Sequence, residues 1–288
     1  MTWQAKANRA IGRLTGFELR RVVLAPRPDA RRTARGRRPE RACERLLDRP
    51  IFVFSSMRSG STLLRVLLDS HSQLHAPHEL HLRGLHVQMG SKHAEAAMGQ
   101  LGLSTTELEY LLWDRVLHAR LQRSGKRYIV NKTPGNAFIW QRIATCWPDA
   151  RFIFLLRHPG ATAISWREIR SSWTLEKAAL DVARYMKAVE AARQALPGMT
   201  IRYEDLTADP EGVTRRICQF LGLDWEPEML DYGKHDHGAY VAGLGDWGQR
   251  IRSGQIQPAR PLPRPEEIPE VLRDLCVTWS YQEASTVK

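Results

Sequence analysis

Hydrophobic residues in the middle of the chain form short, uninterrupted runs separated by segments with helical periodicity. Four runs have the length and composition of buried strands, at residues 51–55, 128–131, 151–156 and 199–203. The main helical segments between and after them cover residues 61–70, 104–122, 175–195 and 209–221. Fully apolar strands that alternate with helices are typical of a parallel sheet covered on both faces. We therefore predict an α/β fold, a single domain with a mainly parallel central sheet flanked by helices.

Positive charge is concentrated at the N-terminal end. Of the net charge of +12, residues 1–49 contribute +9, with thirteen Arg and one Lys against five acidic residues. Three prolines interrupt this segment, although residues 9–23 have the pattern of an amphipathic helix. We predict a basic, Arg-rich N-terminal arm over residues 1–49 and one domain over residues 50–288, with a last helix at about 265–281.

Several protein classes are excluded by what the sequence lacks. No apolar run reaches the roughly 18–20 residues of a membrane-spanning helix, and no secretory signal pattern opens the chain. The four cysteines are far apart and form no CxxC pair, which argues against a zinc site or a disulfide framework. We therefore expect a cytoplasmic protein without a transmembrane segment.

The segment after the first predicted strand has the features of an anion site. In parallel sheets, ligands bind beyond the carboxyl ends of the strands. Here a Ser/Gly loop leads into a helix, whose free N–H groups and dipole favour an anion. Gly60 permits the turn, Ser61 and Thr62 add hydroxyl donors, and Arg58 adds a positive charge. It is not a Walker A loop, because Ser61 stands where that motif has its lysine.

This loop resembles a known family. Residues 54–64, FSSMRSGSTLL, look like the 5′-phosphosulfate loop of sulfotransferases that use 3′-phosphoadenosine-5′-phosphosulfate (PAPS). The match is closest to the branch with Arg in the loop, which includes protein-tyrosine and many bacterial sulfotransferases. The resemblance implies a P-loop-like sulfotransferase fold. It also implies that the phosphosulfate is bound by Arg58, Ser59, Gly60, Ser61 and Thr62.

Further segments agree with this resemblance in order along the chain. Residues 151–165 resemble the 3′-phosphate segment, with Arg157 at the strand end and Ser165 in the next helix. Residues 130–135, VNKTPG, resemble the Asn-Lys-x-Pro element, and residues 202–206 match a common strand end. Residues 243–254 resemble the C-terminal segment that folds over the nucleotide. That segment implies Arg252, Ser253 and Gly254 as further nucleotide ligands.

The resemblance also implies a reaction. A sulfuryl group would pass from PAPS, as co-substrate, to a hydroxyl or amine by in-line displacement, with no metal required. Arg58 and Lys132 are candidates to stabilise the charge that develops on the transferred group. The position of Glu79 after the loop helix matches the base of the tyrosine-modifying branch. His78 is the alternative base, since an unperturbed histidine has a pKa of about 6.5.

The partners are less closely defined. Five histidines crowd residues 71–86, but no HExxH pattern is present and Pro77 interrupts the helix, so we expect no metal site. We expect a small-molecule acceptor, such as a sugar or natural product of bacterial secondary metabolism, and no nucleic acid. The tryptophans near the motifs could form an acceptor wall or core; these are Trp140, Trp166, Trp173 and Trp247. A homodimer or a contact with a carrier protein is also compatible with the sequence.

Two other function classes stay open. A P-loop-like nucleotide kinase would need a Walker A lysine and a Mg²⁺ ligand, neither of which we identify in the sequence. A non-enzymatic protein could bind nucleic acid or an anionic membrane through the Arg-rich segment 1–49. No zinc finger or helix-turn-helix pattern supports that alternative.

Overall fold

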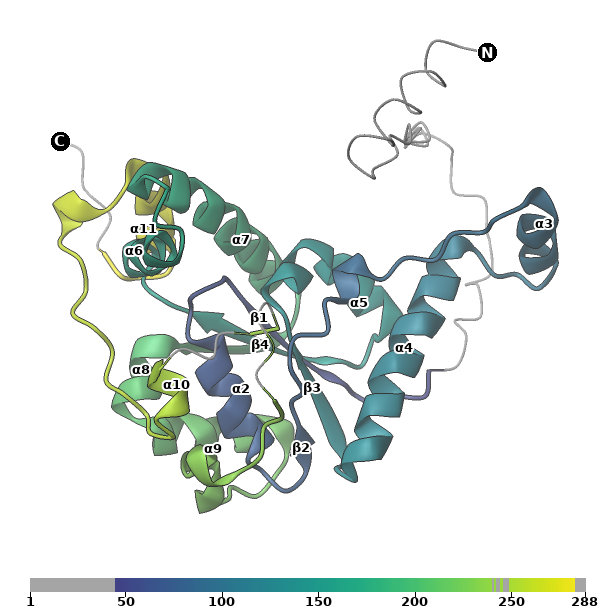
Figure 1. Cartoon of the computed structure of the whole chain (residues 1–288), viewed down its shortest axis with the longest axis horizontal. Helices are drawn as coiled ribbons and strands as arrows, with labels where there is room; N and C mark the ends of the chain where they lie inside the picture. Colours follow the sequence, from purple (N-terminus) through teal and green to yellow (C-terminus); the bar gives the residue numbers. More distant parts are fainter. Residues whose placement is uncertain (1–44, 240, 242–243, 246–248, 283–288) are drawn as a thin grey trace, which may run out of the picture. The chain divides into compact units, whose positions relative to one another are not determined.

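A five-stranded parallel sheet forms the centre of the domain (Figure 1). The computed structural model describes residues 45–239, 241, 244–245 and 249–282, so the helix expected at 9–23 lies outside the described residues. The strand order is β2-β3-β1-β4-β5, and every neighbouring pair is parallel. The strands are β1 Ile51–Ser55, β2 Leu74–His75, β3 Tyr128–Lys132, β4 Arg151–Leu156 and β5 Gly198–Arg202. The predicted α/β fold with a mainly parallel sheet is confirmed.

Helices and short 3-10 segments connect the strands. The helices are α2 Ser61–Asp69, α3 Lys92–Gln100, α4 Thr105–Ser124, α5 Trp140–Cys146, α6 Pro159–Ile169, α7 Leu175–Ala195, α8 Tyr203–Ala208, α9 Pro210–Leu221, α10 Gln249–Arg252 and α11 Arg273–Thr278. The 3-10 segments are Leu82–Gly84, Pro134–Ile139, Pro227–Leu230, Tyr232–Lys234, Pro265–Glu267 and Glu270–Leu272. The four helices predicted with explicit ranges are present, and their ends differ from the prediction by at most two residues.

The last predicted helix, at 265–281, is wrong. This stretch contains two 3-10 turns and then α11, which begins only at Arg273. Pro269 explains the interruption, because proline has no N–H to donate and disfavours a helical conformation in the residue before it.

The two faces of the sheet bury different side chains. Phe52 and Phe54 of β1 pack with α4, α5 and α7, whereas Ile51 and Val53 pack with α2 and α9. This alternation follows from the two-residue period of a strand. In Figure 1, α2, α8 and α9 accordingly lie on one side of the sheet, and α4 and α7 on the other. Because the described helices cover both faces of the sheet, a ligand is expected beyond the carboxyl ends of the strands.

The packed domain begins before residue 50. The Leu47 side chain is buried in the core, and the backbone N–H groups of Leu46 and Leu47 donate to the carboxylate of Asp114 on α4. Arg45 pairs with Glu107 at 3.0 Å. The last residues of the basic segment 1–49 therefore pack as part of the domain.

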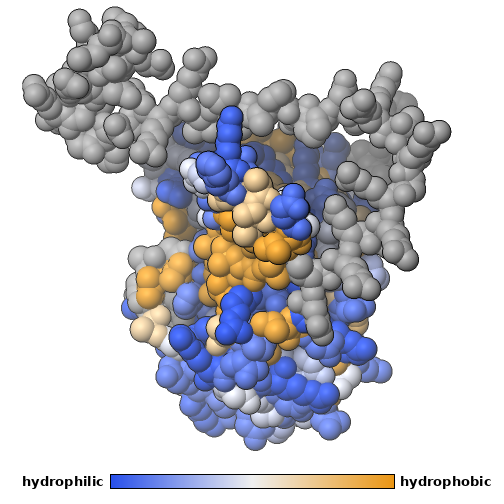
Figure 2. All heavy atoms as spheres, turned by 90° about the vertical axis from the view of Figure 1, so that its right-hand side faces the viewer, coloured by the Kyte–Doolittle hydropathy of each residue, from blue (hydrophilic) through white to orange (hydrophobic). Residues whose placement is uncertain are grey.

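Helix α3 contributes little to the core. None of its residues is buried, and Leu101, directly after it, is 68% exposed. Figure 2 faces the side on which α3 and α4 lie and shows hydrophobic side chains gathered near its centre, with hydrophilic ones around them.

The carboxyl ends of β1, β3 and β4 meet at one edge of the sheet, and the site predicted from the sequence lies there.

Candidate functional site

The loop between β1 and α2 forms a narrow cradle. Gly60 has φ +84°, and a Cβ atom at this position would lie 2.1 Å from Cδ2 of Tyr203. Only glycine fits this combination of backbone conformation and contact. Ser59 is buried and donates to the carbonyl of Ser56 at 2.7 Å, so its hydroxyl closes the loop. Ser61 and Thr62 then open α2, whose first N–H groups have no partner within the helix.

Arg157, at the carboxyl end of β4, is held beside this cradle. Its Nη1 donates to the carbonyl of Arg58 at 2.6 Å, and its guanidinium lies over the Tyr203 ring at 4.5 Å. Its Nε is buried without a hydrogen-bond partner in the described part of the chain. Burial lowers the pKa of Arg157, while Tyr203 and Glu204 oppose that change. A buried guanidinium with an unused donor is suited to bind an anion.

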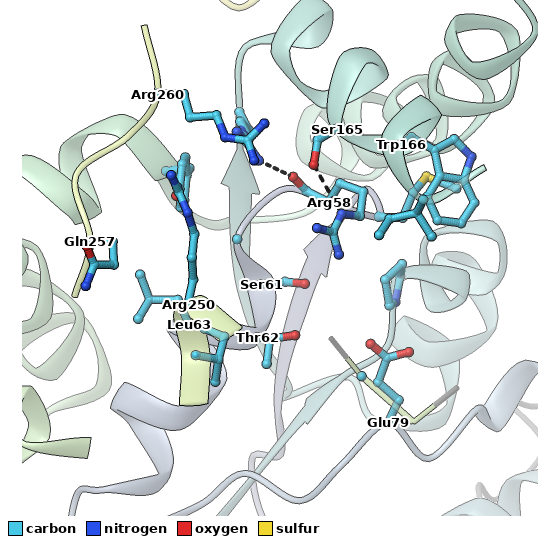
Figure 3. Close-up of a pocket in the computed structure, with 18 of the residues that line it drawn as sticks. Arg58, Ser61, Thr62, Leu63, Glu79, Ser165, Trp166, Arg250, Gln257 and Arg260 are labelled. Carbon is cyan, nitrogen blue, oxygen red and sulfur yellow. Dashed lines mark hydrogen bonds between the residues drawn. The ribbon is translucent and has the colours of Figure 1, made fainter. Parts of the chain in front are cut away.

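Arg58 joins the two predicted phosphate segments. It has φ +57°, and its Nε donates to Oγ of Ser165 on α6 at 3.2 Å (Figure 3). Residues 107 positions apart in the sequence thus meet at one point, as expected when parallel strands end at the same edge. Arg58, Arg157 and Ser165 form one connected group.

Glu79 and Lys132 form a close ion pair. Lys132, at the end of β3, is only 1% exposed, and its Nζ donates to Oε1 of Glu79 at 2.5 Å. The other carboxylate oxygen of Glu79 lies 3.6 Å from Nε2 of His81. His78 lies next to Glu79, with its Nδ1 3.1 Å from the Glu79 carbonyl oxygen.

These groups line a cavity of about 510 Å³. The predicted site residues in its wall are Arg58, Gly60, Ser61, Thr62, Glu79, Arg157 and Ser165. The predicted residues outside this wall are Ser59, His78, Lys132, Arg252, Ser253 and Gly254. Ser59 and Lys132 lie behind the wall. Ser59 contacts the loop through its hydrogen bond to Ser56, and Lys132 contacts Glu79 through their ion pair. We call this space the first cavity.

The C-terminal segment contributes different residues from those predicted. Arg250, Gln255, Gln257 and Arg260 line the first cavity, and Arg250, Gln257 and Arg260 are visible in Figure 3. Ser253, by contrast, donates to the carbonyl of Arg250 at 2.7 Å and shapes the turn after α10. The sequence signal for Arg250 and Arg260 was the basic character of this segment, but no motif distinguished them from their neighbours.

A second cavity of about 520 Å³ adjoins the first. The two cavities share Met57, Glu79, Pro134 and Trp166 in their walls. Glu79 therefore faces two spaces, one of which contains the cradle at Gly60. This arrangement suits the transfer of a group from one bound molecule to another.

The tryptophans proposed as an acceptor wall have different positions. Trp166 lines both cavities and donates from Nε1 to Asp181 at 3.0 Å. Trp173 packs edge-on against Trp166, with 6.5 Å between the ring centroids. Trp140, the first residue of α5, packs against the core, and Trp247 lies outside the described residues.

No helix among the described residues is both long and apolar enough to cross a membrane. Likewise, within the described ranges, no three His, Cys, Asp or Glu side chains come together as a potential metal site.

The chain is similar to known proteins in both sequence and structure. The profile described as "Sulfotransferase family" matches residues 50–227. The sulfotransferase domain of the olefin synthase from Synechococcus PCC 7002 is 25% identical, with a TM-score of 0.64 over 84% of this chain and 98% of that domain. The sulfotransferase domain from the curacin biosynthetic pathway is also 25% identical, with a TM-score of 0.60 over 82% of this chain and 99% of that domain.

Curated relatives show the same similarity. Protein-tyrosine sulfotransferase 1 of Danio rerio is 24% identical over 203 residues, which cover 63% of this chain and 55% of the relative. Nodulation protein NoeE of Sinorhizobium fredii is 25% identical over 237 residues, or 69% of this chain and 55% of the relative. The chain thus spans about half the length of these two relatives. Since the profile matches more than half of the chain and the sheet matches solved domains, the chain belongs to the sulfotransferase family.

Proposed function

We propose that the protein transfers the sulfuryl group of PAPS to a hydroxyl or amine of a small acceptor. The observation that carries this proposal is the position of Glu79, paired with Lys132, in the wall shared by two cavities. The donor would occupy the first cavity and the acceptor the second. Family membership supports the reaction class.

The first cavity fits the charges of PAPS. The 5′-phosphosulfate needs donors and positive charge, and the cradle offers Arg58, the hydroxyls of Ser61 and Thr62, and the start of α2. We assign the 3′-phosphate to Arg157 and Ser165. The unused Nε of Arg157 supports that assignment, because a bound phosphate would give this buried donor a partner.

The wall of the first cavity contains further positive charge. Arg250 and Arg260 come from the C-terminal segment, and Arg260 is held by an ion pair with Glu168 on α6 at 2.6 Å. We assign both arginines to the nucleotide, in place of a direct contact from Arg252. The ion pair would fix the segment across the mouth of the cavity.

Side chains of the site could accept the proton of the acceptor and stabilise the charge on the transferred sulfuryl group. Glu79 would accept the proton of the acceptor hydroxyl, and Lys132, behind the wall, would hold the Glu79 carboxylate in place. Arg58 would stabilise the charge on the transferred group and its leaving oxygen. We favour Glu79 over His78 because Glu79 lines both cavities and His78 lines neither. The proposal uses PAPS as a co-substrate and assigns no role to a metal.

The acceptor is proposed to be a natural product or an intermediate of biosynthesis. One of the two solved domains described above belongs to an olefin synthase, and the other belongs to the curacin biosynthetic pathway. The mixed lining of the second cavity, with Trp166 beside polar groups, suits a small organic molecule. A carrier-bound acceptor is compatible with the same site.

Replacement of the two candidate bases tests the proposal. Acceptors are first found by a screen with sulfur-labelled PAPS and the purified wild-type protein. Glu79→Gln should lower the transfer rate by about 10²–10⁴, the usual contribution of a positioned base. It should leave the affinity for 3′,5′-ADP, the desulfated donor, nearly unchanged. His78→Asn is the matched control, and loss of transfer in that variant alone would show that our choice of base is wrong.

A further inference from the structure

The second cavity is lined by charged groups of both signs. Its lining contains the acidic residues Glu79 and Asp181 and the arginines Arg83 and Arg170, together with His81. A charged side chain that is already paired within the protein is less available to an acceptor. A charged side chain without such a partner therefore indicates which kind of acceptor the cavity can hold.

Both acidic groups already have partners. Glu79 accepts from Lys132 at 2.5 Å. Asp181 accepts from Nε1 of Trp166 at 3.0 Å and lies 3.6 Å from Nη1 of Arg184. A cationic group on the acceptor would therefore have to compete with groups that are fixed in the protein.

The two arginines are arranged differently. The Arg83 guanidinium lies over the Phe138 ring at 4.6 Å, and that of Arg170 lies over the Trp166 ring at 5.0 Å. Neither arginine forms an ion pair with an acidic residue within the part of the chain that the structure describes. The N–H groups of a guanidinium lie in its plane. When the flat face of the guanidinium stacks on an aromatic ring, these N–H groups can still donate hydrogen bonds to a ligand.

The neighbouring polar group also favours an anion. Tyr185 lines the second cavity, and burial together with the charge of Asp181 raises the pKa of its phenol. At neutral pH the phenol is therefore an uncharged hydroxyl that can donate a hydrogen bond. Arg83, Arg170 and Tyr185 all offer donors to the same space.

We propose that the acceptor is a small hydroxylated molecule that also carries an acidic group, a carboxylate or a phosphate monoester. Arg83 and Arg170 bind this group through charge-assisted hydrogen bonds, while Glu79 faces the hydroxyl that receives the sulfuryl group. This inference rests on the proposed function, because it takes the second cavity as the acceptor site. It selects acidic acceptors over neutral ones such as apolar alcohols.

Binding of matched probes to the full chain tests the inference. The first cavity is filled with saturating 3′,5′-ADP, so that no probe can bind at Arg58 or Arg157. Calorimetry then compares 3-(4-hydroxyphenyl)propionate and 2-(4-hydroxyphenyl)ethyl phosphate with the neutral 3-(4-hydroxyphenyl)propionamide. The affinities of the carboxylate probe and the phosphate probe show which acidic group the cavity prefers.

The expected result is that the preferred acidic probe binds wild type about tenfold more tightly than the amide. Arg83→Gln and Arg170→Gln should each reduce this ratio, and the double variant should bring it close to one. Arg120→Gln, which removes an exposed charge on α4 away from the cavity, should keep it. In all variants, unchanged affinity for 3′,5′-ADP shows that the fold and the donor site are intact.

Two results would overturn this inference and leave the proposed function intact. One is wild-type protein that binds 3′,5′-ADP but binds acidic and neutral probes equally or not at all. The other is a preference for acidic probes that survives in the Arg83/Arg170 double variant. Failure of wild type to bind 3′,5′-ADP would instead refute the proposed function itself.

Discussion

Replacement of Gly60 by alanine should damage the cradle in two ways. The φ of +84° disfavours any residue with a Cβ atom, by about 1–2 kcal/mol. The new methyl group would also lie 2.1 Å from Cδ2 of Tyr203, and such overpacking typically costs about 1–3 kcal/mol. The free energy of unfolding should therefore fall by about 2–5 kcal/mol in total.

The same change should weaken nucleotide binding. Tyr203 cannot give way without disturbing Arg157, whose guanidinium lies 4.5 Å from its ring centre. Because Arg157 also donates to the carbonyl of Arg58, a shift of Tyr203 moves the donors proposed for both ends of the nucleotide. The melting temperature of Gly60→Ala should thus respond less to 3′,5′-ADP than that of wild type.

Gly222→Ala provides the matched control. Gly222 also has positive φ, +64°, but no atom lies within 4 Å of its ideal Cβ position. This variant should lose only the conformational part, about 1–2 kcal/mol, and should bind 3′,5′-ADP like wild type. Urea unfolding of the three proteins measures the difference. Equal losses of stability in the two variants would refute the contact with Tyr203 as a constraint on the loop.

Three further predictions follow from individual contacts. Arg157→Gln should weaken 3′,5′-ADP binding about ten- to a hundredfold, measured by calorimetry, while Arg167→Gln, at an exposed position of α6 that does not line the first cavity, should have a much smaller effect. Ser165→Ala removes the acceptor of the Arg58 Nε–H and should reduce 3′,5′-ADP affinity by about 1 kcal/mol; an unchanged affinity would speak against this bond as a positioning contact. Although burial favours the neutral acid, hydrogen bonds from His237, His75 and the Ala76 backbone hold the pKa of Asp69 well below its ordinary range. Its ionised form therefore stabilises the fold above the unfolded-state pKa of about 4, and this stability is lost as the pH falls below that value. Acid titrations of unfolding should show a smaller loss in Asp69→Asn than in wild type.

The sheet and the donor loop were predictable because local sequence determines them. Strands β1 and β4 are apolar apart from one terminal residue each, Ser55 and Arg151, and parallel strands bring the residues that follow them to one edge. The meeting of Arg58 with Ser165 follows from that rule. By contrast, the two-residue strand β2 has too little sequence to be recognised, and it exists only through its pairing with β3.

The second cavity was not predictable from the sequence. Arg83 belongs to a 3-10 turn and Arg170 directly follows α6, and their common surroundings depend on how α7 packs beside them. The same reason applies to Arg250 and Arg260, which reach the first cavity from a segment with little regular structure. The charge of the segment 1–49 pointed toward anionic ligands, but the cations of both cavities come from the domain.

The most direct test of the central claim is a calorimetric titration of the full chain with 3′,5′-ADP. The proposed donor site predicts one molecule bound per chain with a sub-millimolar dissociation constant and without added metal. It further predicts that Arg157→Gln weakens this binding severely while circular dichroism shows a native fold. A folded wild-type protein that gives no binding heat, and whose melting temperature 3′,5′-ADP does not raise, would contradict the claim.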